Sequence, residues 1–205
     1  MTTSQPLLDR FYPIVPDVGW LERIVPLGVK LVQLRIKDAS AADIAAQAKR
    51  AATVCRQNGC TLVLNDYWEA ALDSGIDFIH LGQDDLRDAD LEAIKLAGVR
   101  LGVSTHDVAE LERALAVEPD YVALGPIYET KLKAMPWSPQ GLDKIREWRT
   151  KIGNLPLVAI GGLTPERAAG VLEAGADSLA VITDFLTAPD PEVRIKEWLR
   201  QLQAR

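Results

Sequence analysis

Short apolar runs alternate with longer amphipathic segments along the whole chain. Eight of these runs are rich in β-branched or other apolar residues, and each is followed by a stretch rich in Ala, Leu, Glu and Arg. The runs begin near Phe11, Val29, Thr61, Asp77, Arg100, Tyr121, Pro156 and Asp177. This alternation indicates an α/β fold built from βα units around a parallel sheet. Eight units favour a closed barrel, a single (β/α)8 TIM barrel over residues 1–205, and a doubly wound open sheet is the main alternative.

Residues at the start of two expected helices support this interpretation. Asp107 can cap a helix that runs to Val117, because its carboxylate accepts hydrogen bonds from the free N–H groups of a first turn. Thr164, Pro165 and Glu166 give a helix N-cap, a first helical position and a first-turn acid. Both helices are therefore expected to begin directly after a strand.

The length and composition fit one globular domain, with 48% hydrophobic and 25% charged residues among 205. Barrels of this type average about 250 residues, which leaves this chain little room for insertions. Function must therefore lie in the loops that follow the strands. The longest of these loops, residues 126–139, is a candidate for a mobile lid over the site.

The net charge excludes several classes of partner. At −6, the chain lacks the strongly basic surface that nucleic acids and anionic membranes require. Cys55 and Cys60 are too few for a disulfide framework or a zinc site, so we expect buried free thiols. Residues 1–6 do not resemble a signal peptide, and no apolar run is long enough to span a bilayer. We therefore expect a cytoplasmic protein that binds its anions locally.

Polar and apolar side chains alternate within residues 29–37. In a strand, this alternation places the apolar even positions against the surrounding helices. The opposite set faces the barrel interior and ends in Gln33, Arg35 and Lys37. A solvated strand end is the plain alternative, but Arg and Lys aligned on an inward face are costly unless an anion balances them. We expect the three donors to converge on an anion at the mouth of the barrel.

Carboxylates stand directly after two neighbouring strands. Asn65 and Asp66 follow the third expected strand, and Asp85 follows the fourth. Alone, each Asp is more typical of a helix cap or a turn. As a pair beside a cationic strand end, they suit a hard cation, because Mg²⁺ takes a few carboxylates together with substrate phosphate oxygens. Asp66 and Asp85 are therefore candidate Mg²⁺ ligands.

Ser104, Thr105 and His106 close the fifth expected strand. Ser104 can donate to a phosphate, and a local cap for the helix that starts near Asp107 is an equal alternative. The chain has two histidines: we expect His80 in or near the core, and His106 in a loop or cap. The sequence holds no recognisable nucleophilic triad.

Glycines end the seventh expected strand at Gly161 and Gly162, and Ile182 and Thr183 end the eighth. Phosphate sites in such barrels often use the loops after these two strands, where glycine lets backbone N–H groups approach an anion. A Gly-Gly pair is a weak signal on its own. Its position in the barrel makes it a candidate phosphate site.

Several short motifs, all in the expected order, resemble those of the thiamine phosphate synthase family, also called thiamine phosphate pyrophosphorylase. They are Gln33-Leu-Arg-Ile-Lys37, Asn65-Asp-Tyr-Trp68, His80-Leu-Gly-Gln-Asp-Asp85, Leu101-Gly-Val-Ser-Thr-His106, Gly125-Pro-Ile-Tyr, Pro139-Gln-Gly141 and Ala159-Ile-Gly-Gly162. The resemblance spans nearly the whole chain, and several such motifs together are highly specific.

The resemblance implies a Mg²⁺-dependent coupling of aminopyrimidine methyl diphosphate to a thiazole phosphate, with release of diphosphate. It assigns the pyrimidine diphosphate to Gln33, Arg35, Lys37, Asn65, Ser104 and Lys133, and the thiazole phosphate to Thr130, Gly162, Ile182 and Thr183. It assigns Mg²⁺ to Asp66 and Asp85. The catalytic residues that it implies are Arg35, Lys37, Ser104 and Lys133.

The loop after the sixth strand departs from the family pattern. The family usually has Pro-Thr-x-Thr-Lys where this chain has Glu129-Thr-Lys-Leu-Lys133, so Leu132 replaces a threonine that contacts the thiazole phosphate. Thr183 stands where Ser is usual, and Asp184 stands where a small residue is common. A carboxylate beside a phosphate repels it unless the side chain turns away, and Lys131 is a candidate to compensate. We expect weaker thiazole phosphate binding, with activity retained.

Two other functions stay open. The related thiazole tautomerases share the barrel and the Glu-Thr form of this loop, but they tend to lose the metal aspartates and use His where this chain has Pro126. A non-catalytic barrel that binds thiamine precursors is the third class. Homodimers are common among small barrels, so a homodimer is also open, although no interface stripe stands out in the sequence.

Overall fold

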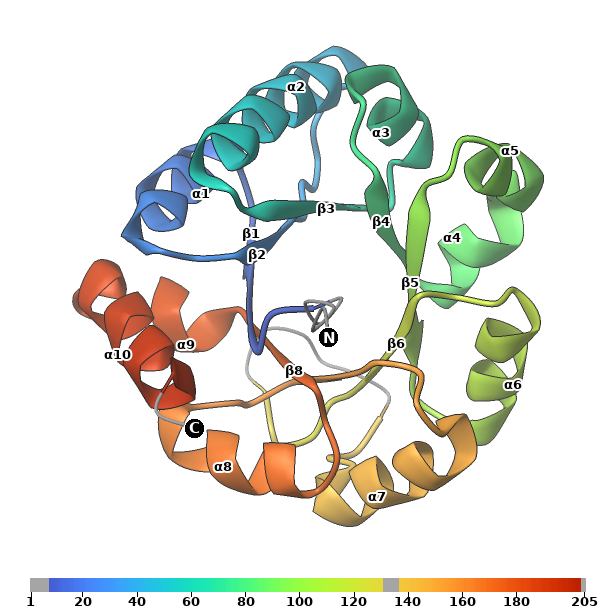
Figure 1. Cartoon of the computed structure of the whole chain (residues 1–205), viewed down its shortest axis with the longest axis vertical. Helices are drawn as coiled ribbons and strands as arrows, with labels where there is room; N and C mark the ends of the chain where they lie inside the picture. The colour runs from blue at the N-terminus through green and yellow to red at the C-terminus, as the bar shows by residue number, and fades with distance from the viewer. Residues whose placement is uncertain (1–7, 131–136, 204–205) are drawn as a thin grey trace, which may run out of the picture.

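The computed structural model describes residues 8–130 and 137–203. In this part of the chain, eight parallel strands close into a barrel in the order of the sequence (Figure 1). The strands are β1 (Phe11–Val15), β2 (Leu31–Leu34), β3 (Thr61–Asn65), β4 (Phe78–Leu81), β5 (Arg100–Thr105), β6 (Tyr121–Leu124), β7 (Leu157–Ile160) and β8 (Ser178–Val181). Because β1 pairs with both β2 and β8, the barrel expected from the sequence is confirmed and the open sheet is excluded.

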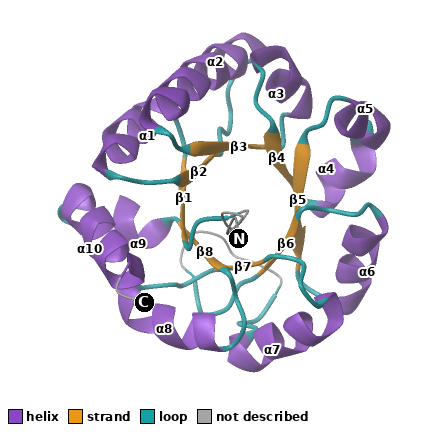
Figure 2. Cartoon of the chain, viewed as in Figure 1, coloured by secondary structure: helices purple, strands orange, loops and turns teal. Residues whose placement is uncertain are grey.

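Helices form a ring around the barrel (Figure 2). They are α1 (Val18–Ile24), the short 3-10 helix η1 (Val25–Leu27), α2 (Ala41–Asn58), α3 (Trp68–Ser74), α4 (Gln83–Asp88), α5 (Leu91–Leu96), α6 (Val108–Ala116), α7 (Gly141–Ile152), α8 (Pro165–Glu173), α9 (Thr183–Leu186) and α10 (Pro191–Gln203). The cap expected at Asp107 is confirmed, since its side chain accepts from the Glu110 N–H. Thr164 stands at the N-cap of α8, but its side chain makes no capping hydrogen bond.

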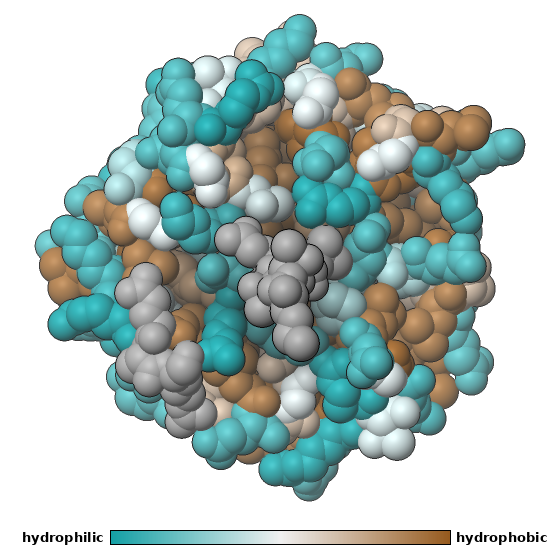
Figure 3. Space-filling view, in the orientation of Figure 1, coloured by the Kyte–Doolittle hydropathy of each residue, from teal (hydrophilic) through white to brown (hydrophobic). Residues whose placement is uncertain are grey.

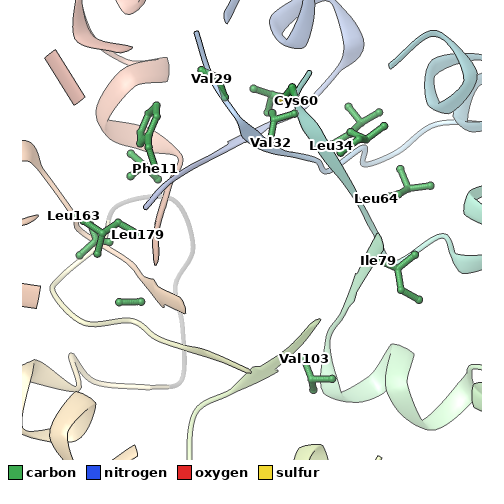
Figure 4. Packing of buried hydrophobic residues seen from close by; sticks show 14 of the residues in the cluster. Phe11, Val29, Val32, Leu34, Cys60, Leu64, Ile79, Val103, Leu163 and Leu179 are labelled. Atoms are coloured by element: carbon green, nitrogen blue, oxygen red, sulfur yellow. The ribbon is translucent and has the colours of Figure 1, made fainter. Parts of the chain in front are cut away.

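Two apolar layers hold the barrel together, as the period of two along a strand requires. The outer layer lies between strands and helices, and Figure 4 shows Leu64, Ile79 and Val103 pointing away from the barrel interior. Val32, Leu34 and Ile36 belong to this layer, as the alternation in the sequence predicts. The inner layer fills the barrel with alternate residues of the same strands, which include Tyr12, Leu31, Val63, Phe78 and Tyr121. The barrel interior below the ends of the strands is therefore packed with side chains.

The face shown in Figure 3 mixes hydrophilic and apolar residues. Hydrophilic residues recur around the perimeter of the face in Figure 3, where the helices lie. Within the described residues, no helix combines the length and the apolar character needed to cross a membrane. Cys55 and Cys60 are buried free thiols, which confirms the expectation from the sequence.

Candidate active site

A cavity of about 760 Å³ opens where the strands end, and it reaches down to Tyr12 and Tyr121 of the inner layer. Its walls include all the predicted site residues that fall within the described part of the chain. These are Gln33, Arg35, Lys37, Asn65, Asp66, Asp85, Ser104, Thr130, Gly162, Ile182 and Thr183. Lys133 lies outside the described residues, as do Lys131 and Leu132. The structure thus brings side chains from distant parts of the sequence to one rim.

The end of β2 contributes the cationic side of the rim. Gln33 is 2% exposed within the strand, and its Nε2 donates to the Tyr12 hydroxyl at 2.9 Å. The backbone N–H of Arg35 donates to the Val15 carbonyl at 2.8 Å, so pairing with β1 continues just past the strand. Lys37 Nζ lies 2.7 Å from Asp66 Oδ2. The inward-facing positions therefore pass from the buried Gln33 through the partly buried Arg35 to the exposed Lys37.

Asp66 and Asp85 form the acidic side of the rim. Asp66 has a φ of 66°, in the left-handed region that residues other than glycine rarely adopt. Its N–H donates to the His80 carbonyl at 2.9 Å, which ties the end of β3 to β4. The pKa of Asp85 is raised, chiefly by burial and then by the neighbouring Asp66 carboxylate. The Asp66 carboxylate thus disfavours the charge of Asp85, and a cation beside the pair would offset that repulsion.

This donor set fits a hard divalent metal that shares its coordination with a substrate. Asp66 directly after β3 and Asp85 in the first turn of α4 offer carboxylate oxygens to the same cavity. Among the described residues, no group of three or more His, Cys, Asp or Glu side chains could hold a metal ion. Mg²⁺ usually binds one or two carboxylates and takes its other oxygens from water and substrate phosphates. The pair therefore suits Mg²⁺ brought together with a phosphate ligand.

A chain of hydrogen bonds runs through the barrel interior to the rim, and we name it the interior relay. Its members are Gln33, Tyr12, Tyr121, His80 and Ser104. The Gln33 bond is followed by a contact of 3.0 Å between the two tyrosine hydroxyls. Tyr121 OH lies 2.8 Å from His80 Nδ1, and His80 Nε2 lies 2.8 Å from Ser104 Oγ. The relay thus links Gln33 to Ser104, two residues of the cavity wall, through three buried rings.

His80 is buried at 7% exposure, which confirms its expected place in or near the core. Burial lowers its pKa to about 4, because removal from water disfavours the charged imidazolium. The imidazole is therefore neutral near pH 7. The alternative role of Ser104 as a helix cap is wrong: Asp107 caps α6, and the Ser104 side chain contacts His80 instead.

His106 lies in the turn between β5 and α6, as expected, and it also lines the cavity. Its Nδ1 lies 2.7 Å from Glu110 Oε2. Its ring stacks on Trp137, with ring centroids 5.5 Å apart and an interplanar angle of 7°. Gln140 Nε2 donates to the His106 carbonyl at 2.9 Å. These contacts hold Trp137 and Gln140 against the turn that follows β5.

The loops after β6 and β7 touch backbone to backbone. Gly162 has a φ of 64°, and a Cβ there would lie 2.4 Å from the Glu129 carbonyl oxygen. The Tyr128 N–H donates to the Gly161 carbonyl at 3.1 Å. Glycine at position 162 is thus required for packing, whether or not an anion binds. The same contact places Thr130 at the cavity wall beside Gly162.

Asp184 turns its carboxylate toward α10. Its two oxygens accept hydrogen bonds from Arg194 Nε and Nη2, each at 2.8 Å. Trp198 Nε1 donates to the same carboxylate at 2.7 Å. Asp184 in turn raises the pKa of Arg194. Arg194 therefore neutralises the carboxylate that stands beside the candidate phosphate site.

Sequence reasoning missed four residues of this region. Tyr12 and Tyr121 belong to the interior relay, Trp137 packs on the cavity wall, and Arg194 holds Asp184. Alternation in β1 and β6 is a signal that places both tyrosines inside the barrel. The partners of Trp137 and Arg194 depend on how loops and helices pack, so no local pattern marks them.

The family model described as thiamine monophosphate synthase matches residues 12–185. The thiamine-phosphate synthase of Rhizobium etli is 58% identical to this chain over 192 residues, which are 94% of each chain. The thiamine-phosphate synthase of Neisseria meningitidis serogroup A is 44% identical over 187 residues, which are 91% of each chain. These relatives therefore align along almost their whole length.

Solved structures agree on the fold. The thiamine phosphate pyrophosphorylase from Pyrococcus furiosus superposes with a TM-score of 0.83 at 24% identity, over 95% of this chain and 96% of that one. The thiamine phosphate pyrophosphorylase from Bacteroides thetaiotaomicron gives a TM-score of 0.67 at 16% identity, over 97% and 99%. The family match and the close sequence relatives together show that this chain belongs to the thiamine monophosphate synthase family.

Proposed function

We propose that this protein joins an aminopyrimidine methyl diphosphate to a thiazole phosphate and forms thiamine phosphate and diphosphate. One observation carries the proposal: cationic side chains, a pair of carboxylates and a candidate phosphate loop all line the same cavity. The relatives named thiamine-phosphate synthase support the same reaction. The tautomerase alternative has less support, because both metal aspartates are present at the rim.

Arg35, Lys37 and Asn65 would hold the diphosphate. Lys133, which lies outside the described residues, would join them. Breaking the C–O bond builds negative charge on the leaving oxygens, and fixed cations beside them stabilise that charge most strongly in the transition state. Mg²⁺ held by Asp66 and Asp85 would supply further positive charge at the same oxygens. The leaving group therefore departs into a site built for its charge.

Gln33 and Ser104 would orient the pyrimidine end of the substrate. The electron pair of the broken C–O bond leaves with diphosphate, and the methylene carbon becomes positive. The electron-rich aminopyrimidine stabilises that carbon, and the thiazole nitrogen then uses its lone pair to form the C–N bond. The protein needs to align the two partners, not to supply a nucleophile, which agrees with the lack of a recognisable triad in the sequence.

Thr130, Gly162, Ile182 and Thr183 would surround the phosphate of the thiazole. Asp184 does not oppose that phosphate with a free charge, because its carboxylate is paired with Arg194. The expected weakening of thiazole phosphate binding by Leu132 concerns a residue outside the described part of the chain, and it stays a prediction.

The proposal is tested by incubating the protein with both phosphorylated precursors and Mg²⁺, and following both products by phosphorus NMR and chromatography. We expect thiamine phosphate and diphosphate in equal amounts, with neither product when one precursor is left out or the metal is chelated. A parallel reaction contains the tautomerase substrate. Isomerisation of that substrate without coupling, or binding of the precursors with neither reaction, would overturn the proposal in favour of the tautomerase or the non-catalytic barrel.

A further inference from the structure

The first member of the interior relay sets the direction of donation, because each later member has a single hydrogen to give. Gln33 presents its side-chain nitrogen, which only donates, to the Tyr12 hydroxyl oxygen. Tyr12 is 1% exposed, and within the described residues its other side-chain hydrogen bond is to Tyr121. The Tyr12 hydrogen therefore goes to the Tyr121 oxygen, because a buried hydroxyl needs its acceptor.

The same reasoning continues through His80. Tyr121 is fully buried, and its hydroxyl also interacts with the Gln33 amide, whose nitrogen donates at this end of the relay. His80 Nδ1, 2.8 Å from the hydroxyl, then accepts the Tyr121 hydrogen. Nδ1 then carries no hydrogen of its own, so the neutral ring carries its hydrogen on Nε2 and donates it to Ser104 Oγ. Ser104 accepts from inside the barrel and keeps its own hydrogen for the cavity that it lines.

Packing holds the middle of the interior relay in place. The rings of His80 and Tyr121 stack, with centroids 5.5 Å apart and an interplanar angle of 17°. Gly102 faces the Tyr121 ring so closely that a Cβ there would lie 2.1 Å from two ring carbons. Phe78 packs edge-on against the same ring, with centroids 5.6 Å apart. Tyr121 therefore has little freedom to turn its hydroxyl away from His80.

We propose that the interior relay fixes Ser104 as a hydrogen-bond donor toward the substrate, with Gln33 setting the direction and His80 acting as a positioning residue. Ser104 then recognises an acceptor, either a phosphate oxygen or an unprotonated ring nitrogen, and not an amino group. A reversed Gln33 amide would present its oxygen to Tyr12, reverse every donation in turn, and leave Ser104 able only to accept. A single buried amide therefore selects which kind of substrate atom the rim binds.

The tautomer of His80 reports this direction in the ligand-free protein. The chain has two histidines, and His106 serves as an internal reference because its Nδ1 faces the acceptor-only carboxylate of Glu110. With ¹⁵N-labelled histidine, NMR should show the His80 hydrogen on Nε2 and a hydrogen on Nδ1 of His106. A His106→Gln variant assigns the two sets of signals.

Two substitutions should change the tautomer of His80 while they keep the packing of the barrel interior. Tyr12→Phe keeps the ring and removes the hydroxyl that joins Gln33 to Tyr121, so a measurable share of His80 should move its hydrogen to Nδ1. Gln33→Glu, when ionised, should raise the fraction of His80 with its hydrogen on Nδ1 still further, because a carboxylate only accepts hydrogen bonds. A hydrogen on Nδ1 of His80 in the unaltered protein, or a tautomer unchanged in both variants, would overturn the relay.

Turnover tests the consequence for Ser104, and this arm rests on the proposed function. Ser104→Ala should lower kcat/KM for the pyrimidine diphosphate about 10-fold to 100-fold, the usual weight of a hydrogen bond to a charged group. The same substitution in a Tyr12→Phe background should cost clearly less, and equal costs in both backgrounds would overturn the coupling. If the ligand-free tautomer is as expected but no coupling reaction occurs, the proposed function fails and the relay stands.

Discussion

At the residue scale, we expect the chemistry of this rim to depend on two carboxylates whose negative charges the protein compensates only in part. One oxygen of Asp66 is held by Lys37, while the raised pKa of Asp85 shows that its charge is disfavoured where it lies. A divalent cation bound to both carboxylates would offset the repulsion between them. The metal and the leaving diphosphate would thus balance charges that the side chains of the rim do not balance among themselves.

Asp66→Ala and Asp85→Ala should each lower turnover by about 100-fold or more, because each removes one of the two carboxylates that would hold Mg²⁺ beside the leaving diphosphate. Circular dichroism should show an intact barrel, since both residues lie at the rim and not in either apolar layer. Asp88→Ala is the matched control, because Asp88 lies in the same helix as Asp85 with its side chain 76% exposed. Near-normal Mg²⁺-dependent activity in both rim variants would refute the metal site.

The directions of single side chains could be predicted wherever the pattern is local. Alternation correctly placed Val32, Leu34 and Ile36 outside the barrel and Gln33 inside it. Ser104 left two alternatives open, because a hydroxyl serves a helix cap and a ligand equally well. Only the contact with His80, which comes from another strand, decides between a cap and a cavity residue. Such partners are set by the fold, and no local pattern contains them.

At the element scale, strand starts were predicted to within two residues. β1, β3, β5 and β6 begin where expected, and β4, β7 and β8 begin one residue later. β7 begins after Pro156 because proline has no backbone N–H to donate to a neighbouring strand, although the Pro156 carbonyl accepts from the Val122 N–H. β2 begins at Leu31, after Gly28 has ended η1 in the left-handed conformation. Apolar runs mark strands well, but the residues that end the preceding turn decide their first position.

The contact between α9 and α10 gives a prediction at this scale. Arg194→Ala should weaken thiazole phosphate binding about tenfold, because it leaves the Asp184 carboxylate without a cationic partner beside the phosphate. Replacing both residues by Ala should restore most of the affinity. Calorimetry would give the dissociation constants, with thermal unfolding as a check on each variant and Arg200→Ala as the control on the same helix. A double variant that binds as weakly as Arg194→Ala would contradict this account.

At the scale of the whole molecule, an acidic chain must bind anions through local arrangement and not through its overall field. The net charge is −6, yet Arg35 and Lys37 meet the candidate phosphate loops at one end of the barrel. Barrel closure could be predicted by counting βα units, because eight such units leave no free edge. The segment with Lys133 lies outside the described residues, so its expected place beside the diphosphate stays a prediction.

A crystal structure with Mn²⁺ and diphosphate would test the shared rim most directly, since anomalous scattering locates Mn²⁺ without ambiguity. We predict the metal between Asp66 and Asp85, bound to an oxygen of each at close to the roughly 2.0–2.1 Å of Mg²⁺ sites. We also predict that the same ion contacts diphosphate oxygens, with Arg35 on their other side. A metal bound elsewhere, or diphosphate held away from Arg35, would contradict the account.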